Sequence, residues 1–402
     1  MNIVNKLTLR HLKLNKRRTL VTVIGVIISA AMIMGVATIS TSFLHLLIRE
    51  TIAHSGEWHV LYREVNKEQL EAIRQDKATK TLIVSRDIGY AEAANATSLY
   101  KPYLFIKSYN DEGFRHFSVE LSEGRLPQTG EELAVSETFI ADTNASYKIG
   151  DTVTLDVGRR YLPEDSGFDV SRNGQYNQSD ALFLDENGKP VEELRDLQSK
   201  TYTIVGIIKQ PAWEPAWSPG YTALTFLDET RLGPEERANG SVILRKVNNG
   251  LYKHAEALAE RLGTGRPVFN SELLRYYGVT DHDNLRTTLY SITGVLMLVI
   301  VIGSVSLIYN AFSISVSERA RHLGMLASVG ATRRQKRNSV FFEGLVISLI
   351  SIPLGIAAGV AGIAVTFLYI SRILQDVTGL SEPLRVVVTW GSVAAACGLS
   401  LL

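Results

Sequence analysis

The 402-residue sequence contains a single cysteine, Cys397, so no disulfide can form within the chain. Its 42 Lys and Arg residues nearly balance 41 Asp and Glu residues, which leaves a formal net charge of +1. Proteins that bind nucleic acid usually carry a dominant basic face. The charge balance therefore gives no case for a nucleic-acid partner.

Catalytic sequence patterns are also missing. The chain has no G-x-x-x-x-G-K-[ST] phosphate-binding loop, no H-E-x-x-H and no G-x-S-x-G. The closest approach to a metal-ligand cluster is the triplet Asp281, His282 and Asp283. Adjacent side chains on a helix or strand point apart, so a solvated helix start explains the triplet better than a metal site. We expect a non-catalytic chain with no metal site and no cofactor of its own.

Four apolar runs interrupt an otherwise mixed sequence, at residues 20–47, 291–314, 341–369 and 386–402. A membrane helix needs about 20 apolar residues, and the first three runs are long enough. The fourth stops with the sequence, and we expect it to be a fourth span cut short. The first run is longer than the apolar core of a signal peptide, about 7 to 15 residues, which favours an uncleaved span.

Basic residues cluster before the first run and between the second and third runs. Lys and Arg in short loops resist translocation, so both clusters are expected on the cytoplasmic side, and the polar segment after the first run is expected outside. The predicted fold is a multi-pass protein of the cell membrane. It has four transmembrane helices, the fourth truncated, and a large extracytoplasmic α+β domain between the first and second.

These patterns divide the chain into consecutive segments. In order, they are a cytoplasmic amphipathic basic helix (1–19), transmembrane helix 1 with a stalk extension (20–47), the extracytoplasmic domain (48–286), transmembrane helix 2 (287–315), a cytoplasmic coupling helix (316–338), transmembrane helix 3 (339–370), a short outer loop (371–385) and the start of transmembrane helix 4 (386–402).

Two similar strand-then-helix units lie near the ends of the extracytoplasmic domain. They predict a repeat-like subdomain of residues 56–100 and 236–275, with a strand-rich subdomain, 101–235, inserted between its halves. Within the insert we expect a long surface excursion at residues 159–199, because it is rich in Asp, Asn and Gly. Four strands are predicted within the insert, at residues 103–108, 114–121, 152–157 and 202–208.

The flanks of the domain, residues 41–52 and 271–294, can extend the neighbouring membrane helices outward as helical stalks. Such paired extensions would couple movement in the membrane to the outer domain. Plain linkers remain the alternative.

The coupling helix presents an apolar stripe at helical spacing. Leu323, Leu326, Ala327 and Gly330 fall at i, i+3, i+4 and i+7, and charged residues flank them. A short helix of this kind suits a groove on a partner protein. The alternative is a helix that lies on lipid headgroups.

Transmembrane helix 3 carries the pattern G-x-x-x-G at Gly355 and Gly359, which lets helices approach closely. Glycine is common in membrane helices, so the pattern alone is weak. Glu343 lies near the inner end of the same helix, where a carboxylate is energetically unfavourable unless it forms an ion pair or is hydrated. An ion pair with Arg337 or an arginine of the coupling helix is favoured over a proton relay.

A proline-stiffened loop, residues 211–220 (PAWEPAWSPG), carries Trp213 and Trp217. Exposed tryptophans suit an apolar or amphipathic ligand, which makes this a candidate ligand loop. The two side chains could equally pack back on the domain.

Together these stretches resemble the FtsX-like, MacB-type permease family of ABC transporters. The resemblance rests on SERARHLGMLASVGATRRQ, on FFEGLVISLISIPLGIAAG and on RHLKLNKRRTLVTVIGVII. Shorter matches follow in order within the outer domain, at residues 124–125, 149–151 and 202–207.

This resemblance implies a permease that binds a separate ABC-type ATPase, in which ATP and Mg would be held. It also implies a second permease subunit, in a homodimer or a heterodimer, within membrane lipid. The residues expected to contact the ATPase are Glu318, Arg319, Arg321, Leu323, Gly324, Leu326, Gly330, Arg333 and Arg334.

The leading functional hypothesis is mechanotransmission. ATP hydrolysis in the partner would move the outer domain, which exports or extracts an amphipathic substrate such as an antimicrobial peptide, a drug or a lipid-linked molecule. Such a function would contribute to antimicrobial peptide resistance. The alternative is a regulatory membrane protein that activates cell-wall hydrolases or signalling partners through its outer domain.

Overall fold

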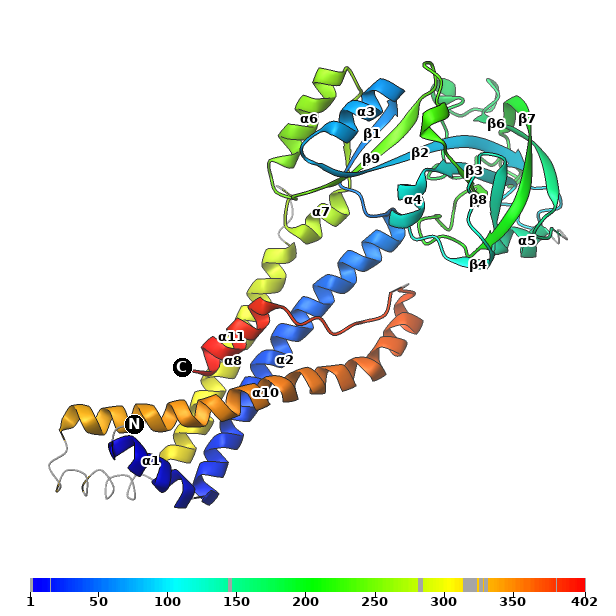
Figure 1. Ribbon diagram of the computed structural model, residues 1–402. Coiled ribbons are helices and arrows are strands. Elements are labelled where there is room, and N and C mark those ends of the chain that lie inside the picture. Colours follow the sequence, from blue (N-terminus) through cyan, green and yellow to red (C-terminus); the bar gives the residue numbers. More distant parts are fainter. Residues whose placement is uncertain are drawn as a thin grey trace. The chain divides into compact units, whose positions relative to one another are not determined.

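The computed structural model describes residues 3–14, 16–143, 147–280, 285–313, 324, 328, 332–380 and 382–401. The chain divides into two compact units (Figure 1). The helical unit comprises Met1–Ile48 and Asn284–Leu402, and the sheet unit comprises Arg49–Asp283. The sheet unit occupies the part of the sequence predicted to form the large polar domain.

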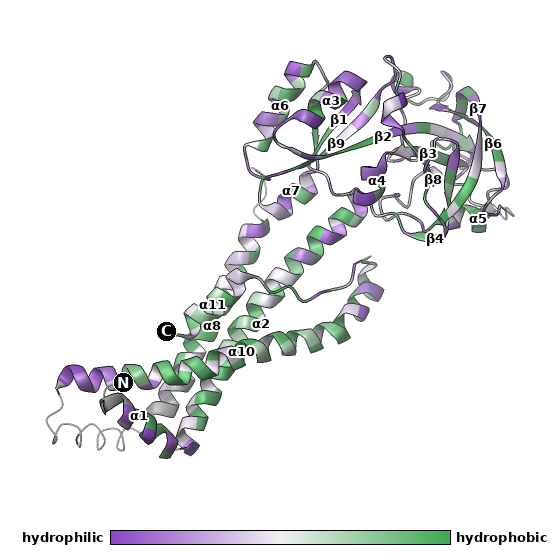
Figure 2. Ribbon diagram, in the orientation of Figure 1, coloured by the Kyte–Doolittle hydropathy of each residue, from purple (hydrophilic) through white to green (hydrophobic). Residues whose placement is uncertain are grey.

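The helical unit is built from five helices in the described part of the chain. They are α1 (Ile3–Leu14), α2 (Lys16–Ser55, whose last residues belong to the sheet unit), α8 (Leu285–Ser313), α10 (Arg333–Thr378) and α11 (Trp390–Ser400). Three segments are long and apolar enough to cross a membrane, namely Thr19–Ser55, Leu285–Ser306 and Arg333–Thr378. Figure 2 shows apolar residues concentrated along α2, α8 and α10, with hydrophilic residues at the start of α10.

Two helix boundaries differ from the sequence prediction, and local capping explains both. Helix α10 begins at Arg333 rather than at residue 339, because Thr332 and Gln335 form a capping box that supports an earlier start. Helix α11 begins at Trp390 rather than at residue 386. Residues 386–388 are three consecutive valines, which favour extended backbone, and Thr389 caps the helix that follows. Four spans are therefore not confirmed, since α11 has only 11 residues.

The sheet unit contains one ten-stranded sheet. Its strands are β1 (Val60–Val65), β2 (Thr79–Glu92), β3 (Tyr103–Tyr109), β4 (Leu121–Gly124), β5 (Glu132–Ser136), β6 (Thr152–Tyr161), β7 (Glu193–Ile208), β8 (Gly220–Phe226), β9 (Ala238–Leu244) and β10 (Val268–Phe269). The strand order is β10-β1-β9-β2-β3-β8-β5-β7-β4, and β6 pairs with both β2 and β7. Its helices are α3 (Lys67–Gln75), α4 (Asp111–His116), α5 (Glu137–Thr143), α6 (Leu251–Leu262) and α7 (Ser271–Tyr277).

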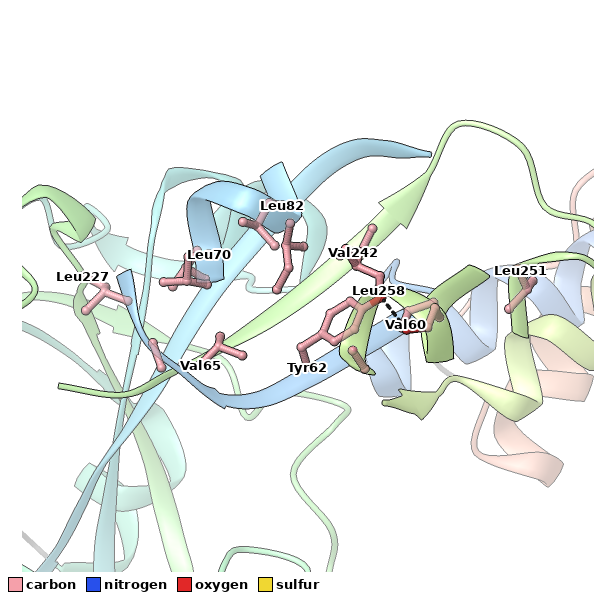
Figure 3. Packing of buried hydrophobic residues seen from close by; sticks show 14 of the residues in the cluster. Val60, Tyr62, Val65, Leu70, Leu82, Leu227, Val242, Leu251 and Leu258 are labelled. Atoms are coloured by element: carbon pink, nitrogen blue, oxygen red, sulfur yellow. Dashed lines mark hydrogen bonds between the residues drawn. The ribbon is translucent and has the colours of Figure 1, made fainter. Parts of the chain in front are cut away.

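The two predicted strand-then-helix units, β1–α3 and β9–α6, come together in the structure. Strands β1 and β9 pair antiparallel, and α3 and α6 pack on them through one hydrophobic core (Figure 3). Tyr62 of β1 and Leu258 of α6 are both buried in this core. However, the 14-residue strand β2 pairs with β9 in its first half and with β3 in its second. The repeat-like part and the predicted insert thus share one strand.

Five strands of the insert close into a barrel together with β2, in the order β2-β3-β8-β5-β7-β6 and back to β2. The closing contact joins Tyr90 of β2 to Gly158 of β6. Two glycines allow these strands to meet. A Cβ on Gly89 would lie 2.5 Å from the Gly158 carbonyl oxygen, and one on Gly158 would crowd the carbonyl oxygen of Arg195. Inward-facing residues of all six strands fill the barrel as one core.

Three of the four predicted strands of the insert are confirmed by β3, β6 and β7. The strand predicted at residues 114–121 is wrong, because α4 occupies its first part. Asn110 caps α4 by accepting a hydrogen bond from the Gly113 amide, and Asp111 and Glu112 lie in its first turn. Only Leu121–Gly124 is a strand, β4.

The surface excursion predicted at residues 159–199 is shorter in the structure than in the prediction. Strand β6 continues to Tyr161 and β7 begins at Glu193, so only the two ends of the segment are sheet, and residues 162–192 form a long connection between the two strands. The connection between the two strands is held by Arg160, whose side chain is fully buried against an equally buried Glu192. Arg160 donates two hydrogen bonds to the Glu192 carboxylate, of 3.0 and 2.8 Å. It donates three more to the carbonyl oxygens of residues 177, 180 and 181.

The two predicted stalks have different outcomes. Helix α2 runs without interruption to Ser55, so residues 41–52 are helical as predicted. In contrast, α7 ends at Gly278, which adopts a left-handed conformation (φ 72°) and accommodates the helix C-cap. A continuous helix through residues 271–294 is therefore wrong. Asp281, His282 and Asp283 lie outside the described residues.

His59 is buried beside the start of β1 and provides a pH-dependent contribution to stability. Its Nδ1 accepts a hydrogen bond of 3.0 Å from the Leu244 amide, and its ring lies 5.7 Å from that of Tyr277. Burial lowers the pKa of His59 to about 4; the charge of Lys80 acts in the same direction and that of Glu57 opposes it.

Because the pKa of His59 is lower in the folded state, its contribution is fully present above the unfolded value of about 6.5 and is lost as the pH falls through about 4. We expect the free energy of unfolding to fall by roughly 3 kcal/mol over this range from His59 alone. Chemical denaturation of the full chain at several pH values measures it. In His59→Asn, whose amide oxygen can accept the same hydrogen bond, this part of the pH dependence should disappear. An unchanged pH dependence in the variant would contradict the assignment.

Candidate functional site

The predicted ATPase-coupling residues fall mostly where the structure makes no statement. Glu318, Arg319, Arg321, Leu323, Leu326 and Gly330 lie outside the described residues. Gly324 is helical and exposed. Arg333 and Arg334 form the exposed first turn of α10. The coupling helix and its apolar stripe therefore stay predictions.

A contact between α1 and the start of α10 was not foreseen from the sequence. The hydroxyls of Thr8 and Ser339 form a hydrogen bond of 2.8 Å in a buried position. One turn further, Leu12 joins a hydrophobic cluster with Val26 of α2 and Ile347 of α10. The expected amphipathic helix is thus packed against the segment that continues from the coupling helix. The near-helical spacing of Thr8 and Leu12 was the available signal.

Exposed basic side chains gather on these two packed segments. They are Lys6, Arg10, Lys13, Lys16 and Arg17 near α1, and Arg333, Arg334 and Arg337 at the start of α10. We call this set the basic end of the helical unit. Two clusters that are far apart in the sequence therefore lie on helices that touch.

Gly355 and Gly359 lie against α2. A Cβ on Gly355 would lie 2.6 Å from the Cβ of Ala30, and one on Gly359 would lie 2.6 Å from the Ala31 carbonyl oxygen. Both glycines are buried. The small residues of the two helices thus form a close-packed contact, which we call the glycine seam. Glu343, on the same helix, is half-buried, and its predicted pairing with Arg337 stays a prediction.

The two tryptophans of the candidate ligand loop differ in exposure. Trp213 is partly buried and packs edge-on against Tyr109, with ring centroids 6.5 Å apart. Trp217 is 61% exposed, and its indole N–H donates to the Ser179 carbonyl oxygen at 3.3 Å. The loop is anchored between them by Glu214, whose buried carboxylate accepts hydrogen bonds from Lys101 and from the Thr222 amide. Only Trp217 is therefore available to a ligand.

One end of the barrel contains a cavity of about 280 Å³ that the sequence did not indicate. Its walls come from β2, β3, β7 and β8 and from the residues before β5. The lining residues are Ile88, Ser108, Gly130, Glu131, Lys200, Thr201, Tyr202, Thr225, Phe226 and Leu227. Among the residues that the structure describes, no group of three or more His, Cys, Asp or Glu side chains could hold a metal ion.

Long apolar helices, a basic end and a separate folded sheet unit define the chain as a membrane protein with one large polar domain. Comparison with known proteins shows what the chain is similar to. The family model described as FtsX-like permease C-terminal matches residues 294–402. An uncharacterized ABC transporter permease, YknZ of Bacillus subtilis (strain 168), is 22% identical over 366 residues, which cover 89% of this chain and 85% of the relative. Residues 294–402 are thus similar to the C-terminal part of FtsX-like permeases, and most of the chain is similar to an ABC transporter permease.

Two solved structures were also matched. The periplasmic region of MacB from Actinobacillus actinomycetemcomitans is 9% identical, with a TM-score of 0.33, and the match covers 58% of this chain and 98% of that one. The extracellular domain of the noncanonic ABC-type transporter YknZ from Gram-positive bacteria is 10% identical, with a TM-score of 0.31, over 53% of this chain and 98% of that one.

Proposed function

We propose that this permease is the subunit through which a separate ATPase drives movement of the sheet unit. The observation that carries the proposal is α2, one helix from Lys16 to Ser55. Its residues up to Ile48 belong to the helical unit, and those from Arg49 belong to the sheet unit. A rigid helix can carry a displacement along its length, so movement of α2 at the basic end would reach the sheet unit.

The orientation in the membrane follows from charge. Lys and Arg near membrane helices resist translocation, and the basic end therefore supports a cytoplasmic position for α1 and the start of α10. The sheet unit is then extracytoplasmic. In this orientation the coupling helix, which immediately precedes α10, faces the compartment that contains ATP.

In this proposal, the glycine seam transmits movement of α10 to α2 within the helical unit. Helix α10 follows the coupling helix in the chain, and Gly355 and Gly359 bring α10 into backbone contact with α2. A push on the coupling helix would therefore be passed from α10 to α2. ATP and Mg bind in the partner ATPase in this scheme, and a second permease subunit, identical or different, would complete the transporter in the lipid bilayer.

The substrate class that we propose is amphipathic, such as an antimicrobial peptide, a drug or a lipid-linked molecule. Its support is the exposed indole of Trp217 on an anchored loop. Aromatic side chains of this kind bind partners that have both apolar and polar parts.

Co-purification tests the docking step. The tagged chain is expressed in a native-like membrane, and its partners are recovered with and without the double substitution Leu323→Asp and Leu326→Asp. We expect an ABC-type ATPase to accompany the unaltered chain, and we expect at least about tenfold less of it with the double variant. Two buried charges in an apolar groove would cost more than the ~1.4 kcal/mol that corresponds to a tenfold loss.

Met325→Asp is the matched control. It adds the same charge to the same predicted helix, but on the face opposite the apolar stripe. Its ATPase recovery should equal that of the unaltered chain. If no ATPase is recovered with any of the chains, the transporter proposal fails, and cell-wall enzymes that bind the sheet unit become the class of partner to seek.

A further inference from the structure

The polar cavity at the barrel end follows from the register of the strands. Ile106 of β3, Ala223 of β8 and Leu133 of β5 belong to the core inside the barrel. Side chains alternate along a strand, so the residues two positions away point to the same side. Those residues include Ser108, Thr225 and Glu131, and the step from Tyr202 of β7 leads in the same way to Lys200. The apolar interior therefore ends in a polar layer that lines the cavity.

Lys200 is the unusual member of this layer. It is half-buried, and in the described part of the chain no hydrogen bond or ion pair joins its side chain to another residue. Burial lowers the pKa of Lys200, and the nearby positive charge of Arg86 acts in the same direction, while Glu236 opposes both. Arg86 itself forms an ion pair of 2.6 Å with Glu236. An ammonium group in this environment gains from a further anion.

The remaining lining restricts what that anion can be. The hydroxyls of Ser108 and Thr225 already donate to carbonyl oxygens, and Lys200 is the one cationic residue in the lining. Glu131 lies in the same lining, and its charge disfavours a doubly charged ligand such as a phosphate monoester. Ile88, Tyr202 and Phe226 provide apolar wall. One negative charge on a short apolar group therefore fits this cavity best.

We propose that this end of the barrel binds a singly charged carboxylate attached to a short apolar group, with Lys200 as its counter-ion. The volume of about 280 Å³ is below the roughly 300–1,000 Å³ of pockets that hold drug-sized ligands, so the bound part is small. An acyl chain and the C-terminal residue of an apolar peptide both supply this chemistry. Ligands of this size bind with affinities near about 1 mM. The inference is independent of the ATPase partner.

Lysine-selective acylation of the full chain in lipid nanodiscs, without any ATPase, reads the site directly. Mass spectrometry compares Lys200 with Lys246, an exposed lysine after β9. At ten times its dissociation constant, a ligand leaves Lys200 free about a tenth of the time, so its labelling should fall about tenfold. The probes are hexanoate for an acyl chain and N-acetylphenylalanine for a peptide terminus, each beside its uncharged amide.

We expect at least one carboxylate to protect Lys200 while its amide does not, with Lys246 unaffected. Protection by hexanoate alone would identify an acyl source, and protection by N-acetylphenylalanine alone a peptide source; both support the proposal. Equal protection by carboxylate and amide, equal protection of Lys246, or no protection would overturn it.

Variants of the lining residues provide a second test, in which the ligand-induced rise in melting temperature is measured for each variant. The rise should vanish in Lys200→Met, persist in Lys200→Arg and Lys246→Met, and increase in Glu131→Gln, which removes the opposing charge. A rise that survives unchanged in a folded Lys200→Met chain would contradict the role of Lys200. The result does not depend on whether the chain couples to an ATPase.

Discussion

Replacement of Arg160 by Met is expected to lower the free energy of unfolding of the sheet unit by about 3–5 kcal/mol. The Glu192 carboxylate would keep its buried position but lose its two charge-assisted hydrogen bonds. The carbonyl oxygens of residues 177, 180 and 181 would lose their donors as well. Buried polar groups without partners are the costly outcome of such a change.

Arg160 also contacts two aromatic rings, so its replacement is expected to destabilise more than the ion pair with Glu192. Its guanidinium lies 5.5 Å from the Tyr90 ring and 5.8 Å from the Tyr176 ring. Tyr90 pairs with Gly158 where β2 and β6 close the barrel. We therefore expect the connection between β6 and β7 to become susceptible to proteolysis in the variant.

Arg172→Met is the matched control. Arg172 also makes two hydrogen bonds to one carboxylate, that of Asp180, but its side chain is 51% exposed. Exposed ion pairs contribute about 0–1 kcal/mol. Thermal and chemical denaturation of the full chain in nanodiscs measure both variants. If Arg160→Met costs no more than Arg172→Met, the network does not organise this segment. Arg160→Met combined with Glu192→Leu should recover part of the loss, because no buried charge remains.

Gly359→Leu is expected to have the second large effect, by separating α10 from α2. The first added carbon would lie 2.6 Å from the Ala31 carbonyl oxygen and 3.1 Å from the Met34 Cβ. The nearest atom is backbone, so it cannot rotate away, and the helices must move apart. Overpacking of this kind costs about 1–3 kcal/mol or more. Loss of the contact should also uncouple the bound ATPase from the permease.

Gly362→Leu, on the same helix, is the control. A Cβ at Gly362 would meet no atom within 4 Å, and the residue is exposed. Thermal unfolding in nanodiscs and the ATPase rate of the complex measure both variants. We expect Gly362→Leu to match the unaltered chain in both. Equal behaviour of the two leucine variants would mean that the glycine seam does not support the helix pair.

The sequence alone was sufficient for features that depend on local pattern. Apolar runs identified the three long helices, and strand-like runs separated by Gly, Pro and Asp turns identified β3, β6 and β7. The break at Gly278 could have been predicted too, since a glycine directly after SELLRYY is a common helix stop. Likewise, Asn110 followed by two acidic residues is a helix start, and attention to that cap would have avoided the mistaken strand.

Features that depend on contacts between residues far apart in the sequence could not be predicted from local patterns. Closure of the barrel joins residues 90 and 158, and only their proximity explains why Gly89 and Gly158 lack side chains. Arg160 and Lys200 looked like ordinary basic residues of polar segments. The burial of the first and the cavity beside the second arise from strands and turns that lie far from them in the sequence.

The measurement that tests the central claim most directly is the distance between the two units during ATP turnover. Spin labels at the exposed positions Glu256→Cys on α6 and Thr288→Cys on α8 report on the sheet unit and the helical unit, once Cys397 is replaced by Ser. In the complex with its ATPase, we expect the distance distribution to shift when ATP is added, and we expect no shift with Leu323→Asp and Leu326→Asp. A distribution that ATP leaves unchanged in an actively hydrolysing complex would contradict mechanical coupling through this chain.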